Sequence, residues 1–136
     1  MPDEIIFFVD QCMAGTAIPE TITKASGCQT KIFREHFDLD AKDPIWLPEV
    51  GKWGWVLVTK DWRIQRRPLE RTAILNAGVR AFVLEPENLP LEAILTLLRL
   101  TVPKFMTAIQ RYKAPFIFAV EMNGELKALS DLIPNE

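Results

Sequence analysis

The chain has few of the side chains that bind zinc or form disulfides. Its 136 residues include one histidine, His36, and two cysteines, Cys12 and Cys28. Two cysteines are too few for a disulfide framework, and no second pair lies at the spacing of zinc ligands. We therefore expect both thiols to be reduced and packed as small hydrophobic side chains.

Long hydrophobic runs are absent as well. The apolar run near the start covers residues 5–9, whereas a membrane-spanning helix needs roughly 20 residues. The start, Met1-Pro2-Asp3-Glu4, is acidic where a secretory signal would be basic. With 49% apolar and 25% charged residues, the composition predicts one globular domain over residues 1–136, cytoplasmic and without membrane association.

The chain also lacks an excess of positive charge. Its formal net charge is −2, which argues against a nucleic-acid binder that is basic over its whole surface. Residues 60–71 are nevertheless basic, with two acids, Asp61 and Glu70, against Lys60, Arg63, Arg66, Arg67 and Arg71. Such a run is either the solvated end of a helix or a local contact surface for an anionic partner.

Three apolar runs rich in β-branched and aromatic residues predict buried strands at residues 4–9, 55–59 and 79–84. A loose alternation over residues 28–33 predicts a second, shorter strand. Helical patterns lie between them. One begins near Ile18 or Pro19 and ends at Gly27. A second covers residues 43–50, with Asp43 as its N-cap and with Gly51 and Gly54 where the chain reverses. The third covers residues 68–77 and places Leu69, Ala73 and Ile74 on one face, with Gly78 as its cap.

Alternating strands and helices of this kind predict a three-layer α/β/α fold with a mainly parallel, Rossmann-like sheet. The last third of the chain predicts a helix over residues 91–112 that Pro103 kinks or splits. A C-terminal β-hairpin should follow, with Asn123-Gly124 forming a type I′ turn. Leu97 and Leu100 lie off the main apolar face of the long helix, so the hairpin, a second copy or a partner protein must cover them.

Three aspartates fall where such a fold gathers functional groups. Asp10 and Asp61 follow predicted strands, and Asp43 begins the helix that leads to the strand before Asp61. Each aspartate alone can be explained as a solvated loop residue or a helix cap. Three carboxylates brought together need a counter-charge, because like charges a few Å apart force one carboxyl group to stay protonated. Since only oxygen ligands are at hand, the pattern favours Mg²⁺ or Mn²⁺.

These segments resemble a known family. The run that ends at Asp10, the helix start Asp43-Pro44-Ile45-Trp46, and the strand that ends in Thr59-Lys60-Asp61 are similar to the PIN-like domain, in particular to compact VapC-type toxins. The resemblance covers roughly residues 4–84. It implies a metal-dependent endoribonuclease in which Asp10, Asp43 and Asp61 bind one or two Mg²⁺ or Mn²⁺ ions. It also implies a toxin that a cognate antitoxin holds inactive.

PIN nucleases usually have a fourth acid between the first two aspartates. This interval contains Glu20, Glu35, Asp38 and Asp40, and Glu35 is our choice because it follows the second predicted strand. His36 is not required as a general base, because a bound metal lowers the pKa of its own water molecule. We therefore assign His36 a structural or surface role.

The basic run then becomes a candidate RNA contact. We expect Lys60, Arg63, Arg66 and Arg67 to bind the phosphate backbone, and Trp62 to be the tryptophan best placed to stack on a base. The alternative is a catalytically incomplete PIN-like fold that binds a nucleic acid or a protein. A phosphorylation receiver domain fits less well, because Asp10 is followed by Gln11 rather than by a second acid. As partners we expect a homodimer or an antitoxin.

Overall fold

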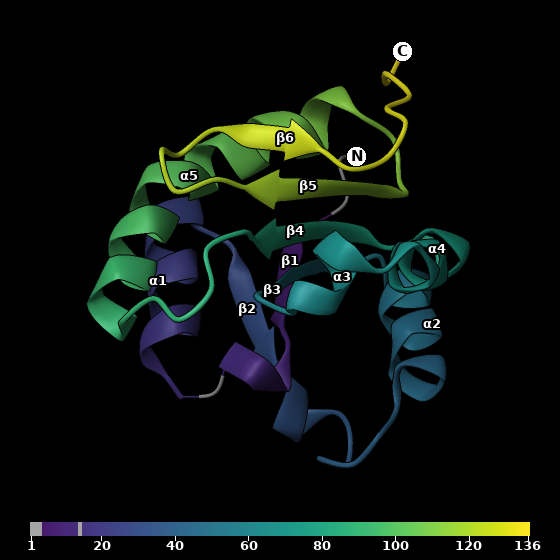
Figure 1. The fold of residues 1–136 in the computed structure, drawn as a ribbon, viewed down its shortest axis with the longest axis horizontal. Helices are drawn as coiled ribbons and strands as arrows, with labels where there is room; N and C mark the ends of the chain where they lie inside the picture. The colour runs from purple at the N-terminus through teal and green to yellow at the C-terminus, as the bar shows by residue number, and fades with distance from the viewer. Residues whose placement is uncertain (1–3, 14) are drawn as a thin grey trace.

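The computed structural model describes residues 4–13 and 15–136, so the first three residues of the acidic start lie outside the described part. Six strands form one sheet in the order β2-β1-β3-β4-β5-β6 (Figure 1). Their bounds are Ile6–Val9, Gln29–Ile32, Val56–Thr59, Arg80–Leu84, Phe116–Val120 and Leu126–Ala128 for β1 to β6. All neighbours from β2 to β5 are parallel, and β6 is antiparallel to β5. The predicted α/β class and the C-terminal hairpin are confirmed.

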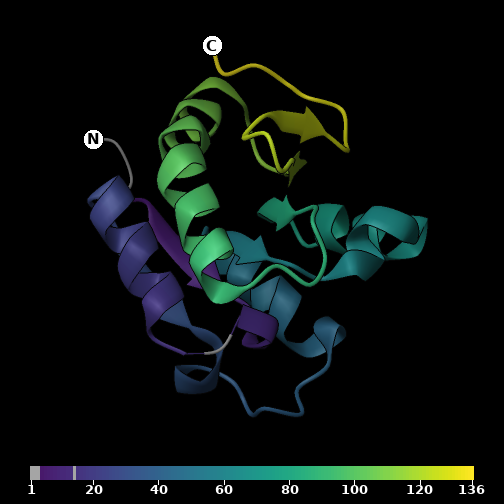
Figure 2. The same cartoon turned by 60° about the vertical axis from the view of Figure 1, so that its left-hand side comes forward.

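Helices cover both faces of the sheet. On one face lie α1 (Ala17–Ser26) and α5 (Leu91–Arg111), which pack along each other (Figure 2). On the other face lie α2 (Asp43–Trp53), α3 (Trp62–Arg66) and α4 (Pro68–Asn76). Two short 3₁₀ helices, η1 (Gln11–Met13) and η2 (Phe33–Glu35), follow β1 and β2. No helix among residues 4–13 and 15–136 is long and apolar enough to cross a membrane.

The continuous apolar runs reflect strands that are buried on both sides. Phe7 and Val9 face α1 and α5, whereas Phe8 between them joins the cluster under α2. The same alternation holds in β4, where Phe82 stacks on Phe105 of α5 with ring centroids 4.0 Å apart. Because each face of the sheet meets helices, nearly every position of the inner strands must be apolar.

The helix α2 differs from its prediction. It begins at Asp43, with Lys42 in the N-cap position, and it continues to Trp53. Gly51 therefore lies inside the helix rather than at a reversal, and Gly54 (φ 71°) ends it. A Cβ atom at Gly51 would overlap the carbonyl oxygen of Ala77, so this glycine permits the close approach of α2 to the end of α4.

Other local predictions are also corrected. Leu69 is 82% exposed and does not belong to the buried face of α4. Pro103 lies inside one continuous helix and does not split it. In the hairpin, the amide of Gly124 donates to the carbonyl of Glu121. Asn123 lacks the positive φ that a type I′ turn requires of it, so the type I′ assignment was wrong.

The two leucines of α5 have different surroundings. Leu97 is 6% exposed and belongs to the core. Leu100 is 54% exposed, although it lies against Gly124 of the hairpin turn. The fold thus covers one of the two within the chain and leaves the other partly open.

Candidate active site

The site lies at the carboxyl ends of the neighbouring strands β1 and β3. Asp10 directly follows β1, and Asp61 comes two residues after Thr59, the last residue of β3. The buried hydroxyl group of Thr59 donates a hydrogen bond to Asp10 Oδ2 (3.0 Å) and accepts one from the amide of Asp61 (3.1 Å). Thr59 therefore fixes both acidic segments relative to each other.

Asp43 reaches the same place from the first turn of α2. Together with Asp10 and Asp61 it lines a cavity of about 410 Å³ at the rim of the sheet. The same three side chains also line a much smaller cavity of about 10 Å³, which Glu70 of α4 completes. That smaller volume corresponds to about one water-sized sphere. Three separated segments thus place the three predicted aspartates around the same two cavities.

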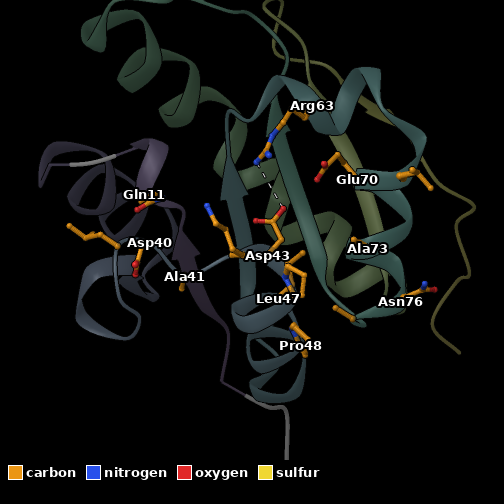
Figure 3. A pocket seen from close by; sticks show the side chains of 15 residues that line it. Gln11, Asp40, Ala41, Asp43, Leu47, Pro48, Arg63, Glu70, Ala73 and Asn76 are labelled. Carbon is orange, nitrogen blue, oxygen red and sulfur yellow. Dashed lines mark ion pairs between the residues drawn. The ribbon is translucent and has the colours of Figure 1, made fainter.

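Arg63 lies among these acids as a counter-charge. Its backbone amide donates to Asp61 Oδ1 (3.0 Å), and its side-chain Nε donates to the same carboxylate at 2.9 and 3.1 Å. Its Nη2 also lies 4.0 Å from Asp43 Oδ2. Figure 3 shows the Arg63 side chain pointing from α3 toward Asp43, with Glu70 beside it. The guanidinium group therefore balances part of the negative charge of the site.

The pKa values of the two strand-end acids shift in opposite directions. Burial raises the pKa of Asp10, and the negative charge of Asp61 adds to this effect, although the hydrogen bond from Thr59 opposes it. Partial burial also acts on Asp61, but hydrogen bonds from Arg63 and the charges of Arg63 and Arg67 outweigh it and lower the pKa of Asp61. A cation near Asp10 would favour its ionised form.

The thiol of Cys12 lies at the same rim. Its Sγ atom is 3.4 Å from the Thr59 hydroxyl, and it lines the 410 Å³ cavity. Burial, followed by the charge of Asp10, raises the pKa of this thiol. Cys12 is therefore held as a neutral thiol rather than as a nucleophilic thiolate.

The acidic side chains that line the smaller cavity, Asp10, Asp43, Asp61 and Glu70, offer the carboxylate oxygens that a hard divalent cation prefers. Within residues 4–13 and 15–136, however, no three histidine, cysteine or acidic side chains lie close enough to hold an ion as they stand. The contact between Arg63 and Asp61 accounts for part of this, since it turns both Asp61 oxygens toward the guanidinium group. A cation would have to compete with Arg63 for these oxygens.

Glu35 does not join the three aspartates. It is exposed on η2 and lines neither of their cavities. The reason is topological: η2 follows the edge strand β2, which lies on the opposite side of β1 from β3. His36 lies nearby, exposed, and its ring is 4.9 Å from that of Trp55 between centroids.

The predicted RNA-binding cations divide into two groups. Lys60 and Arg63 line the 410 Å³ cavity. Arg66 forms an ion pair with Glu87 (2.7 Å), and the guanidinium group of Arg67 lies 4.9 Å from the centre of the Trp62 ring. Arg63 and Arg66 lie on α3, Lys60 lies just before its start and Arg67 directly follows its end.

Two residues of the site, Thr59 and Glu70, were not predicted from the sequence. Thr59 carried a usable signal, because it lies two residues before Asp61 in a strand end and can cap that turn. The sequence carries no such signal for Glu70, because an acid in the first turn of a helix is explained by the helix dipole alone.

A larger groove of about 770 Å³ lies between α2 and α4 and shares Asp43, Arg63 and Glu70 with the site (Figure 3).

Comparisons with known proteins give a related protein and a matching family model. A protein of Mycobacterium tuberculosis (strain ATCC 25618 / H37Rv) named "Putative ribonuclease VapC45" is 25% identical over 126 residues, which cover 90% of each chain. No solved structure matches the chain significantly. The family model described as "PIN like domain" matches residues 5–86, from the start of β1 past the end of β4, which includes Asp10, Asp43 and Asp61. The chain therefore belongs to the PIN-like domain family.

Proposed function

We propose that this protein is a metal-dependent endoribonuclease. The observation that carries the proposal is the convergence of Asp10, Asp43 and Asp61 on one cavity from three separate segments. Membership of the PIN-like family and the ribonuclease named above support it. Mg²⁺ or Mn²⁺ is the cofactor that the oxygen donors favour.

Each residue then has a defined task. Asp10, Asp43 and Asp61 would hold the divalent ion, and Thr59 keeps Asp10 and Asp61 in position through its two hydrogen bonds. A bound ion of this kind lowers the pKa of water and stabilises charge on a phosphate group. Lys60, at the rim of the same cavity, would bind the RNA backbone, together with Arg63 once it leaves Asp61.

The proposal is tested by incubating the purified chain with a labelled single-stranded RNA and Mg²⁺ or Mn²⁺. We expect cleavage that EDTA stops and that Asp10→Asn and Asp61→Asn abolish. Asp38→Asn removes an exposed carboxylate outside both cavities and should leave cleavage unchanged. A folded wild-type protein that cleaves no RNA with either metal would contradict the proposal.

The biological setting that we propose is the toxin of a toxin–antitoxin pair in the cytoplasm. The name of the mycobacterial relative supports this, because VapC denotes such toxins in the family that the sequence resembles. The partners would be an RNA substrate, a cognate antitoxin and, as a further option, a second copy of the chain. Expression of the chain alone should then arrest growth, whereas Asp61→Asn at equal expression should not.

A second candidate function is a PIN-like module that binds without cleaving. It is favoured by the contact between Arg63 and Asp61, which occupies one carboxylate of the site with an internal cation. Tight RNA binding by a wild-type protein that cleaves nothing in either metal would support this second function.

A further inference from the structure

Trp62 differs from the other tryptophans in its surroundings. Trp46 is 5% exposed in the core, and Trp53 and Trp55 contact each other and His36 in one aromatic group. Trp62 is 41% exposed at the start of α3 and lines the 410 Å³ cavity together with Asp10 and Asp61. A large aromatic surface therefore lies beside the proposed cleavage site and is accessible from it.

Two guanidinium groups lie against the indole ring of Trp62. The Cζ atom of Arg67 is 4.9 Å from the ring centre, and that of Arg66 is 5.7 Å from it. Arg66 is held in turn by its ion pair with Glu87 of the loop after β4. These contacts fix the orientation of the ring and place two positive charges next to it.

This combination has the properties of a stacking site for a nucleobase. Aromatic rings flanked by cations bind unpaired bases, because the ring offers a stacking surface while the cations attract the neighbouring phosphates. The cavity volume of about 410 Å³ lies at the lower end of the roughly 300–1,000 Å³ typical of small-ligand sites. One nucleotide next to the aspartates therefore fits this cavity by size.

We propose that Trp62, with Arg66 and Arg67, forms a base-stacking subsite that selects single-stranded RNA and positions the nucleotide next to the cleaved phosphate. This inference rests on the proposed ribonuclease function. Bases inside a duplex are already stacked and cannot reach the ring, so double-stranded RNA should bind poorly. Because every base has a π surface, the subsite should show little preference among the four bases.

Binding to two oligonucleotides tests the inference. Fluorescence anisotropy is measured with a labelled single-stranded RNA 12-mer and with the same 12-mer made abasic at its central positions, using the Asp10→Asn protein to prevent cleavage. Adding Trp62→Ala or Trp62→Leu should weaken binding of the normal 12-mer about 5- to 150-fold, the equivalent of roughly 1–3 kcal/mol per stacked base. Neither change should weaken binding of the abasic 12-mer further.

Two controls make the result specific. Trp53→Ala removes a tryptophan of similar exposure, 42%, that lies away from the acids in the aromatic group, and RNA binding should persist. Trp62→Leu keeps an apolar side chain, so melting curves that match those of the parent show that the loss of binding is not a loss of folding.

Several results would contradict the proposal of a base-stacking subsite. It fails if the Trp62 variants bind the normal 12-mer as tightly as the parent, or if they lose affinity equally for both oligonucleotides. It also fails if a duplex binds as tightly as the single strand. These outcomes leave the ribonuclease proposal intact when the wild type still cleaves RNA, whereas a chain that neither binds nor cleaves RNA contradicts both.

Discussion

At the scale of single residues, we expect Arg63 to compete with a cation for the acids of the site. Its guanidinium group binds Asp61 and lies near Asp43, where it neutralises charge that a divalent ion would otherwise meet. Arg63→Ala should therefore tighten Mn²⁺ binding about two- to fivefold, from the roughly 0.4–1 kcal/mol that a partly exposed ion pair contributes. Isothermal titration with Mn²⁺ measures this, and Arg99→Ala on α5 serves as the control. Equal Mn²⁺ affinity in wild type and Arg63→Ala would show that Arg63 does not compete with the ion.

The raised pKa of Asp10 gives a pH-dependent prediction. Burial and the charge of Asp61 favour the protonated form in the folded state. The folded protein therefore binds more protons than the unfolded chain between the two pKa values, and its stability falls as the pH rises through that window. At pH values above the pKa that Asp10 has in the folded state, its ionised carboxylate lowers the free energy of unfolding.

Asp10→Asn should therefore raise the melting temperature at pH 7 in EDTA, because the amide can still accept the hydrogen bond from Thr59. The gain should shrink as the pH falls toward the unfolded pKa of Asp10. Melting curves in EDTA from acidic to neutral pH measure the effect, and a variant less stable than wild type at pH 7 would contradict it.

The residues of the site were only partly predictable. Asp10 and Asp61 could be expected to lie close together because they follow strands that are neighbours in the sheet, whereas Asp43 could be chosen only as the start of a strongly patterned helix. Glu35 was chosen by position in the chain, and the edge location of β2 keeps it away from the aspartates. The contact between Arg63 and Asp61 could not be predicted from the sequence, because side chains two residues apart at a helix start can point in several directions.

At the scale of elements, the contact between α2 and α4 depends on one glycine. A Cβ atom at Gly51 would overlap the backbone oxygen of Ala77, which cannot move without shifting the end of α4. Gly51→Ala should lower the free energy of unfolding by about 1–3 kcal/mol, the typical effect of overpacking. Lys52→Ala at the exposed next position should change it by less than about 0.5 kcal/mol. Chemical denaturation measures both, and equal stability of the two variants would contradict this account.

Elements were predictable where burial imposed a pattern. The strands lie within one or two residues of the predicted segments, and β1, β3 and β4 were the clearest because nearly every position of a strand covered on both faces is apolar. The helix α3 was not predicted, because a segment of five residues is too short for a helical periodicity to be detected. The hairpin was foreseen but not its turn type, since Asn-Gly allows more than one turn geometry.

At the scale of the whole molecule, the fold explains how an acidic chain could act on an anionic polymer. The net charge is −2, but the basic residues of α3 lie beside the acids at one rim of the sheet. A divalent cation bound by the aspartates would reverse the sign of the local field.

The central claim is that Asp10, Asp43 and Asp61 together bind a divalent cation. Diffraction from crystals soaked in Mn²⁺, recorded near the manganese absorption edge, tests it most directly. We expect an anomalous peak in contact with oxygens of Asp10 and of at least one other aspartate, with the Arg63 side chain moved away from Asp61. A map without a peak among these three carboxylates at saturating Mn²⁺, with the contact between Arg63 and Asp61 unchanged, would contradict the claim.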